Sequence, residues 1–134
     1  MNSNSCVSNV VRWGDSPSSQ FDSLFDVVIA ADVVYHDLCV SSLLQTVFDL
    51  LKSGGHFILF NPPRASKLNT FVDIAKSSGF FSDISICENF DPIVSAVKAE
   101  LILSNPLFNP EWHYPYKVVF RKNEAPASNC NEQY

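Results

Sequence analysis

Phe25-Asp26-Val27-Val28-Ile29-Ala30-Ala31-Asp32-Val33-Val34-Tyr35 is the stretch of this sequence that decides the fold. Residues 25–31 form a short, nearly continuous apolar run, which is typical of a parallel strand covered on both faces. The polar residues that follow at once, Asp32 and then His36-Asp37, exclude a long helix. A strand this apolar is expected to pair on both sides, so we expect a neighbouring strand at each of its edges.

The remainder of the chain alternates between helical and extended patterns. Apolar residues at helical spacing predict helices over roughly residues 39–52, between Ser66 and Gly79, and over 92–103. Further strands are predicted at 56–60, around Ile84 and Ile86, and at 116–120, with the Ile84 strand near an edge. This order of strands and helices indicates an α/β fold with a mainly parallel sheet.

Several element ends carry recognisable signals. Lys52 is expected in the last turn of the first helix, where a cation is favourable, and Gly54-Gly55 is expected to supply its left-handed C-cap. Ser66 is expected to cap the second helix, and Gly79 to end it. Pro62-Pro63 ends the second strand, because proline cannot donate to a sheet ladder.

The composition indicates one folded domain with a hydrophobic core. The chain has 134 residues, of which 46% are hydrophobic and 17% charged. We expect residues 7–122 to form that domain, and residues 1–6 and 123–134, which lack periodicity, to be disordered. The net charge of −5 and the scattered basic residues argue against a nucleic-acid-binding protein.

The sequence shows no targeting, redox or metal pattern. Its first residues, Met-Asn-Ser-Asn-Ser, lack the basic and apolar regions of a signal peptide, and no apolar run approaches the ~20 residues that span a bilayer. The four cysteines include no C-x-x-C pair, which favours reduced thiols in a cytosolic or nuclear protein. The three histidines lack metal-ligand spacing, so no metal site is predicted.

Ligands of open α/β sheets bind just beyond the carboxyl ends of the strands, and two such ends carry chemistry here. Asp32 and Tyr35 follow the most apolar strand and are expected to face one crevice. A carboxylate there can orient an amine for methyl transfer, and an aromatic face tolerates the cationic product. The alternative is structural: Asp32 caps the next turn, and Tyr35 packs with its hydroxyl in water.

The second such end is Asn61-Pro62-Pro63-Arg64. Several amino-group methyltransferases carry N-P-P followed by an aromatic residue, but Arg64 stands in that place here. We therefore interpret this stretch as a rigid strand-ending turn, with Arg64 able to face the crevice.

A third candidate precedes the apolar strand. Trp13 can lie against an adenine ring, and Asp15 can accept a hydrogen bond from its amino group; a core tryptophan is an equal alternative. The four glycines include no G-x-G pair that would cradle a nucleotide or a sulfonium nucleoside. We therefore expect this chain alone to bind such a cofactor weakly.

Together these residues resemble the latter half of the class I, seven-β-strand protein methyltransferases. The resemblance rests on Val11–Asp15, Phe25–Tyr35 and Leu51–Gly55 in that order. It comes nearest to the calmodulin-lysine N-methyltransferases through Phe60–Arg64, Leu68–Phe71, Ala75–Phe80, Asn105-Pro106 and His113-Tyr114-Pro115. It implies an incomplete Rossmann-like methyltransferase domain, the cofactor S-adenosylmethionine and calmodulin as the protein partner.

The resemblance also assigns roles to single residues. Trp13 and Ala31 would contact the cofactor, and Asp32 and Tyr35 would face the target lysine. Two alternatives stay open: a non-catalytic interaction module that keeps the substrate-facing half, and a fragment of a nicotinamide-dependent Rossmann enzyme. The Trp-Gly-Asp block and the D-x-x-Y favour the methyltransferase. For the isolated chain we also expect self-association through an exposed sheet edge.

Overall fold

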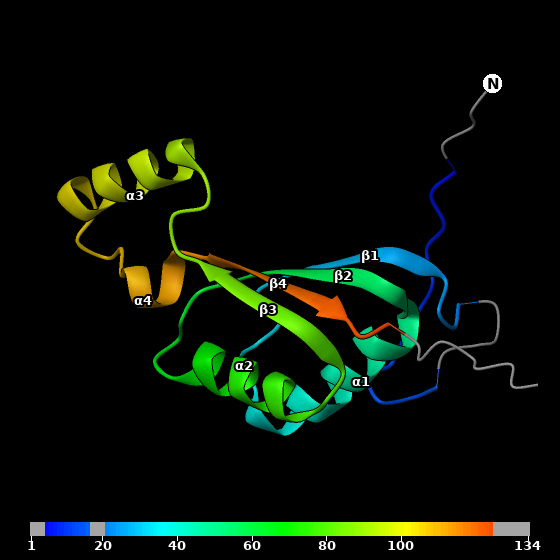
Figure 1. Cartoon of the computed structure of the whole chain (residues 1–134). Helices are drawn as coiled ribbons and strands as arrows, with labels where there is room; N and C mark the ends of the chain where they lie inside the picture. Colours follow the sequence, from blue (N-terminus) through cyan, green and yellow to red (C-terminus); the bar gives the residue numbers. More distant parts are fainter. Residues whose placement is uncertain (1–4, 17–20, 125–134) are drawn as a thin grey trace, which may run out of the picture.

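A computed structural model describes residues 5–16 and 21–124 of the chain (Figure 1). It is an α/β structure whose elements follow the predicted order of strands and helices. The elements are β1 (Phe25–Ala31), the 3-10 helix η1 (Asp37–Cys39), α1 (Val40–Leu50), β2 (Leu51–Asn61), α2 (Lys67–Ser77), β3 (Phe81–Cys87), α3 (Pro92–Ser104), α4 (Pro110–His113) and β4 (Tyr116–Lys122). The predicted disordered ends, residues 1–6 and 123–134, fall largely outside the described residues.

The four strands form one sheet in the order β1-β2-β4-β3. β1 is parallel to β2, whereas β4 is antiparallel to both of its neighbours, β2 and β3. The prediction of a mainly parallel sheet was therefore wrong for the pairing of neighbouring strands, which is antiparallel for β2 with β4 and for β3 with β4. The strands β1, β2 and β3 do run in one direction. The last strand inserts between β2 and β3, which local sequence patterns cannot reveal. The predicted edge position of the Ile84 strand is confirmed.

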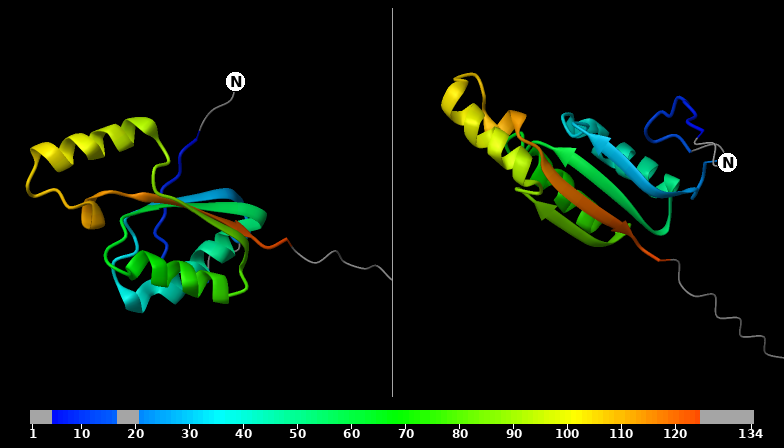
Figure 2. Two further views of the ribbon diagram at one scale, coloured as in Figure 1. Left: turned by 60° about the vertical axis from the view of Figure 1, so that its left-hand side comes forward. Right: turned by 90° about the horizontal axis from the view of Figure 1, so that it is seen from above.

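The hydrophobic core lies on one face of the sheet, under α1 and α2 (Figures 1 and 2). Alternate residues of the two central strands point into it, as the period of two in a strand requires. The buried core includes Phe57 and Leu59 of β2, Val118 and Phe120 of β4, Leu43, Leu44 and Val47 of α1, and Leu68, Phe71, Val72 and Ala75 of α2. These helical residues recur at the spacing from which both helices were predicted.

The end of α1 differs from the prediction. The helix ends at Leu50, and Leu51 already has an extended backbone, so Lys52 lies in β2 and not in the last turn. Gly54, with φ +74°, and Gly55 form an irregularity within β2 instead of a helix cap. A Cβ at Gly55 would lie 2.9 Å from the Lys52 carbonyl oxygen and 3.0 Å from that of Asp26, so the close approach of β1 requires glycine.

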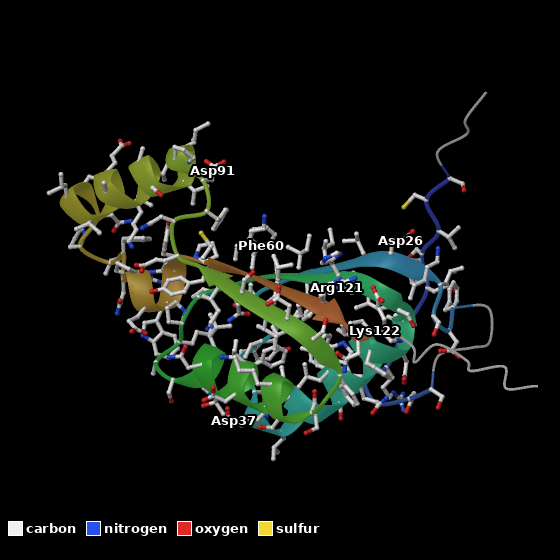
Figure 3. The ribbon with its side chains drawn as sticks, viewed as in Figure 1. Asp26, Asp37, Phe60, Asp91, Arg121 and Lys122 are labelled. Carbon is white, nitrogen blue, oxygen red and sulfur yellow. The ribbon has the colours of Figure 1, made fainter. Side chains whose placement is uncertain are left out.

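Lys122, which the sequence analysis did not single out, caps α1 in place of the glycines. Its side chain reaches across from β4 and is almost fully buried (Figure 3). The Nζ atom donates hydrogen bonds of 2.6 Å to the carbonyl oxygens of Phe48 and Leu51, and lies 4.1 Å from the centre of the Phe48 ring. A cation at this position satisfies carbonyl groups that every helix leaves unpaired at its C-terminus.

The opposite face of the sheet is open among the described residues. Ile29, Ile58 and Val119 lie in register in one row across β1, β2 and β4. Ile29 is 73% exposed, and Val27 beside it on β1 is half exposed. Figure 3 shows Phe60 on this face, away from α1 and α2. The prediction that β1 is covered on both faces and paired on both sides is thus not met: within residues 5–16 and 21–124, β1 pairs with β2 alone.

α3 extends from one end of the sheet and buries no residue (Figure 2). Its predicted extent of 92–103 is confirmed within one residue, but its apolar side chains, such as Ile93 and Val97, are exposed. The buried Tyr114 contacts α3 and the loop before it. Its hydroxyl donates to Asn89 over 3.1 Å, and the Lys98 Nζ of α3 lies 4.2 Å from the centre of its ring. None of the helices in the described part of the chain is long and apolar enough to cross a membrane.

Candidate functional site

A cavity of ≈ 420 Å³ opens at the carboxyl end of β1. It lies where the ends of β1 and β2 meet α4 and the loop before α2, at the place where ligands of α/β sheets bind. Its lining combines one carboxylate, one guanidinium and several rings: Ala31, Asp32, Phe60, Pro62, Arg64, Trp112, His113 and Pro115. Of the predicted site residues, the structure brings Ala31, Asp32 and Arg64 together in this cavity.

Asp32 is held at the cavity by its backbone. Its φ is +54°, in the left-handed region that non-glycine residues rarely adopt, and its N–H donates to the Phe60 carbonyl oxygen over 2.8 Å. Its Oδ1 accepts hydrogen bonds from the Arg64 Nη2 over 2.6 Å and from the Arg64 Nε over 3.1 Å. The Asp32 side chain remains 57% exposed, so a ligand can reach it.

Asn61 fixes the loop that carries the D-x-x-Y motif. Its fully buried side chain accepts a hydrogen bond from the Val34 N–H over 3.0 Å and donates to the Val34 and Pro62 carbonyl oxygens over 3.4 and 2.9 Å. The interpretation of Asn61–Arg64 as only a strand-ending turn was therefore too narrow. Asn61 joins the ends of β1 and β2, and so holds the backbone two residues beyond Asp32.

α4 closes the other side of the cavity. The Glu111 carbonyl oxygen accepts from the Arg64 N–H over 2.8 Å, and its Oε2 accepts from the Ala65 N–H over 3.0 Å. The Arg64 guanidinium carbon lies 5.8 Å from the centre of the Trp112 ring. Neither this helix nor Trp112 was predicted from the sequence, although Asn109 as N-cap followed by Pro110 is a recognisable helix start.

Tyr35 does not line the cavity with Asp32. It is 57% exposed in the segment before η1, where the His36 Nδ1 accepts from the Leu38 N–H over 3.3 Å. The expectation that Asp32 and Tyr35 face one crevice is therefore not met in this arrangement. Because η1 starts two residues after Tyr35, the chain turns away from the end of β1 at this point.

The three predicted cofactor residues are likewise separated. Ala31 lines the cavity, but Trp13 packs against the hydrophobic core beside α1. The Gly14 N–H donates to the Thr46 Oγ1 of α1 over 2.9 Å, and the Asp15 N–H donates to the Arg12 carbonyl oxygen over 3.2 Å. Trp13 thus packs as a core tryptophan, which was the alternative to its lying against an adenine ring.

A family model described as lysine methyltransferase matches residues 1–78, more than half of the chain. The chain belongs to the lysine methyltransferase family. The match contains Asp32, Asn61 and Arg64, whereas Trp112 and the rest of the α4 wall lie beyond it.

Three solved structures resemble this chain at low identity. The first is a putative sarcosine dimethylglycine methyltransferase from Galdieria sulphuraria, at 18% identity and a TM-score of 0.43, covering 77% of this chain and 55% of that one. The second is phosphoethanolamine N-methyltransferase 2 from Haemonchus contortus, solved with phosphomonomethylethanolamine and S-adenosylhomocysteine, at 16% and 0.46, covering 78% and 34%. The third is a SAM-dependent methyltransferase from Archaeoglobus fulgidus, at 18% and 0.44, covering 76% and 61%.

This chain therefore spans between about a third and three fifths of those solved chains. The family assignment rests on the family model alone.

The cavity residues can bind an amine. They place a reachable carboxylate, that of Asp32, in a cavity with aromatic rings, which is a setting for a cationic or nucleophilic amine. The lining contains no glycine, so no glycine loop lies among these residues.

Proposed function

We propose that this chain provides the amine-binding side of a protein-lysine N-methyltransferase, with S-adenosylmethionine as methyl donor and calmodulin as protein substrate. The observation that carries the proposal is Asp32, exposed at the carboxyl end of β1 in a cavity with aromatic walls. The family match supports lysine methylation, and the resemblance to calmodulin-lysine N-methyltransferases supports the choice of calmodulin.

The cavity residues and Asn61 have separate roles in binding the amine. Asp32 accepts a hydrogen bond from the lysine nitrogen and thereby orients its lone pair, and such positioning contributes about 10²-fold or more to a rate. Phe60 and Trp112 provide ring faces that tolerate the positive charge on the methylated product. Asn61 acts as a positioning residue, because it fixes the loop that follows Asp32.

The test is methyl transfer to calmodulin by this chain joined to the glycine-loop half of a family member. Asp32→Ala is expected to lower the transfer rate at saturating cofactor by about 10²-fold, because the amine loses its orienting group. Tyr35→Phe should have a smaller effect, since Tyr35 lies outside the cavity and keeps its ring. The matched control is Asp37→Ala, which removes another exposed, ion-paired carboxylate, bound to Lys67 over 3.2 Å.

Two outcomes would contradict different parts of the proposal. Near-normal transfer by Asp32→Ala, with an unchanged melting temperature, would remove Asp32 from the site. Transfer to other lysine-containing proteins but never to calmodulin, followed by mass spectrometry, would replace the substrate and leave the amine site standing. A folded, joined protein that transfers no methyl group to any of them would favour the non-catalytic interaction module.

A further inference from the structure

Arg64 occupies the one carboxylate among the cavity residues and lies over one of the cavity's rings. Its guanidinium donates twice to the Asp32 Oδ1, and its central carbon lies 5.8 Å from the centre of the Trp112 ring. A lysine ammonium group that binds the Asp32 Oδ1 beside Trp112 must therefore displace Arg64.

The backbone holds Arg64 in this position at the expense of strain. Arg64 and Ala65 have φ of +48° and +57°, and Asp32 opposite them has φ of +54°. Of the four described non-glycine residues with positive φ, Asp32 and Arg64 line the cavity and Ala65 directly follows Arg64. Such conformations persist where surrounding contacts enforce them, and they cluster at functional sites. Here the enforcing contacts are the hydrogen bonds from the Arg64 and Ala65 N–H groups to Glu111.

The ion pair is tight in geometry but open to water. The Arg64 side chain is 22% exposed and that of Asp32 57%. An ion pair that is partly exposed to water changes an equilibrium constant by a factor of up to about five. An incoming cation can therefore displace Arg64 from Asp32 without a large loss of binding affinity.

We propose that Arg64 is an internal stand-in for the substrate: it occupies Asp32 and Trp112 while the cavity is empty, and a lysine ammonium group displaces it on binding. This inference rests on the proposed amine-binding function and adds a competing, autoinhibitory contact to it. The ligand class is a primary or methylated ammonium group on an aliphatic stem.

The test is a titration of the purified chain with Nα-acetyl-lysine methylamide, followed through the indole N–H signals by NMR. Trp112 reports on the cavity, while Trp13, packed on the core, serves as an internal reference. Arg64→Met is expected to tighten binding by about three- to five-fold, because the competing cation is gone. The matched control is Arg121→Met, which removes the same charge from another exposed pair, with Glu124 at 2.6 Å, and should leave the affinity unchanged.

A double-mutant cycle identifies the group through which Arg64 acts. In an Asp32→Asn background, Arg64→Met should give no gain, because the two side chains then no longer compete for a carboxylate. The inference is overturned if Arg64→Met leaves the affinity for the lysine derivative unchanged or weakens it. It is also overturned if neither the natural chain nor Arg64→Met binds the derivative, or if Arg121→Met tightens binding as much as Arg64→Met does. The proposed function is judged separately, by the methyl-transfer assay of Asp32→Ala.

Discussion

Asn61 is the residue on which the geometry of the candidate site depends most. Its buried amide makes three hydrogen bonds, two of them to the backbone of Val34. The shape of a loop without helix or strand structure thus depends on one side chain 27 residues away. A buried polar group that loses its partner is expensive, because no water replaces the lost hydrogen bond.

Asn61→Ala is therefore expected to lower the free energy of unfolding by about 2–3 kcal/mol, because it leaves the Val34 N–H and C=O without their partner. Urea unfolding measures this change. The control is Asn69→Ala on the exposed face of α2, which should alter stability by less than about 0.5 kcal/mol. Equal effects of the two substitutions would show that Asn61 does not hold the loop.

Lys122 makes the stability of the fold depend on pH. Burial lowers the pKa of Lys122 from its usual 10.5, an effect that the carboxylates of Asp22 and Asp49 partly oppose. Between the lowered pKa and 10.5 the unfolded chain binds this proton more readily than the folded chain does. The contribution of Lys122 to the free energy of unfolding therefore rises as the pH increases towards 10.5.

We expect the stability difference between the natural protein and Lys122→Met to grow as the pH rises from neutral towards 10. At neutral pH the variant loses about 1–3 kcal/mol, because the carbonyl oxygens of Phe48 and Leu51 lose their donor. Urea unfolding at several pH values is the measurement, with Lys117→Met on the same strand as control. Tyr116 does not disturb this comparison. Burial raises the pKa of Tyr116 from 10.0, with Glu88 adding to the rise, so its ionisation destabilises the natural protein and Lys122→Met alike above that pH. A difference that shrinks with rising pH would contradict the assignment.

At the scale of elements, α3 is a helix that depends on its own ends and on few tertiary contacts. The Asp91 side chain caps it by accepting from the N–H groups of Ile93 and Val94 over 2.8 and 3.1 Å, and Pro92 occupies the first turn. No residue of the helix is buried. Its local stability is therefore separable from that of the sheet and its two core helices.

Asp91→Ala is expected to destabilise α3 by about 1 kcal/mol through loss of the cap. Amide hydrogen exchange in α3 should then accelerate about five-fold, whereas exchange in β2 and β4 should not change, because the core does not rest on this helix. Glu100→Ala, in the exposed middle of the helix, is the control. An equal acceleration in β4 would show that α3 and the sheet unfold together.

At the scale of the whole molecule, the described residues form two layers with one apolar sheet face left open. The row of Ile29, Ile58 and Val119 lies on the face away from α1 and α2, and among the described strands β1 has a free edge. Unpaired strand edges and contiguous apolar patches are surfaces on which chains associate.

We therefore expect the isolated chain to self-associate and Ile29→Lys to reduce its average mass in light scattering. Ile29 is exposed on this face in the edge strand β1, and a lysine there places a charge in any contact made through this face or edge. Leu103→Lys, which changes an even more exposed apolar residue on α3, is the control and should leave the mass unchanged. A natural protein that stays monomeric over a wide concentration range would contradict the expectation.

Local patterns in the sequence determined the elements of this protein. The apolar run of β1, the helical spacing in α1 and α2, and the carboxylate of Asp32 just after a strand could all be recognised without coordinates, because each depends on residues close together in the chain. The lysine methyltransferase family was likewise indicated by the order of short blocks. The helix end at Leu50 was misjudged, because a lysine from a distant strand, not the neighbouring glycines, caps it.

Only the tertiary structure decided what surrounds Asp32. The insertion of β4 between β2 and β3, the clasp of Asn61 on Val34, and the approach of α4 to Arg64 all join segments that are far apart in the sequence. Such contacts follow from how whole elements bury their apolar faces together, so no local pattern encodes them. For this reason the sequence could point to a carboxylate at one strand end and to an arginine after the next, but not to their ion pair or to the tryptophan that shares their cavity.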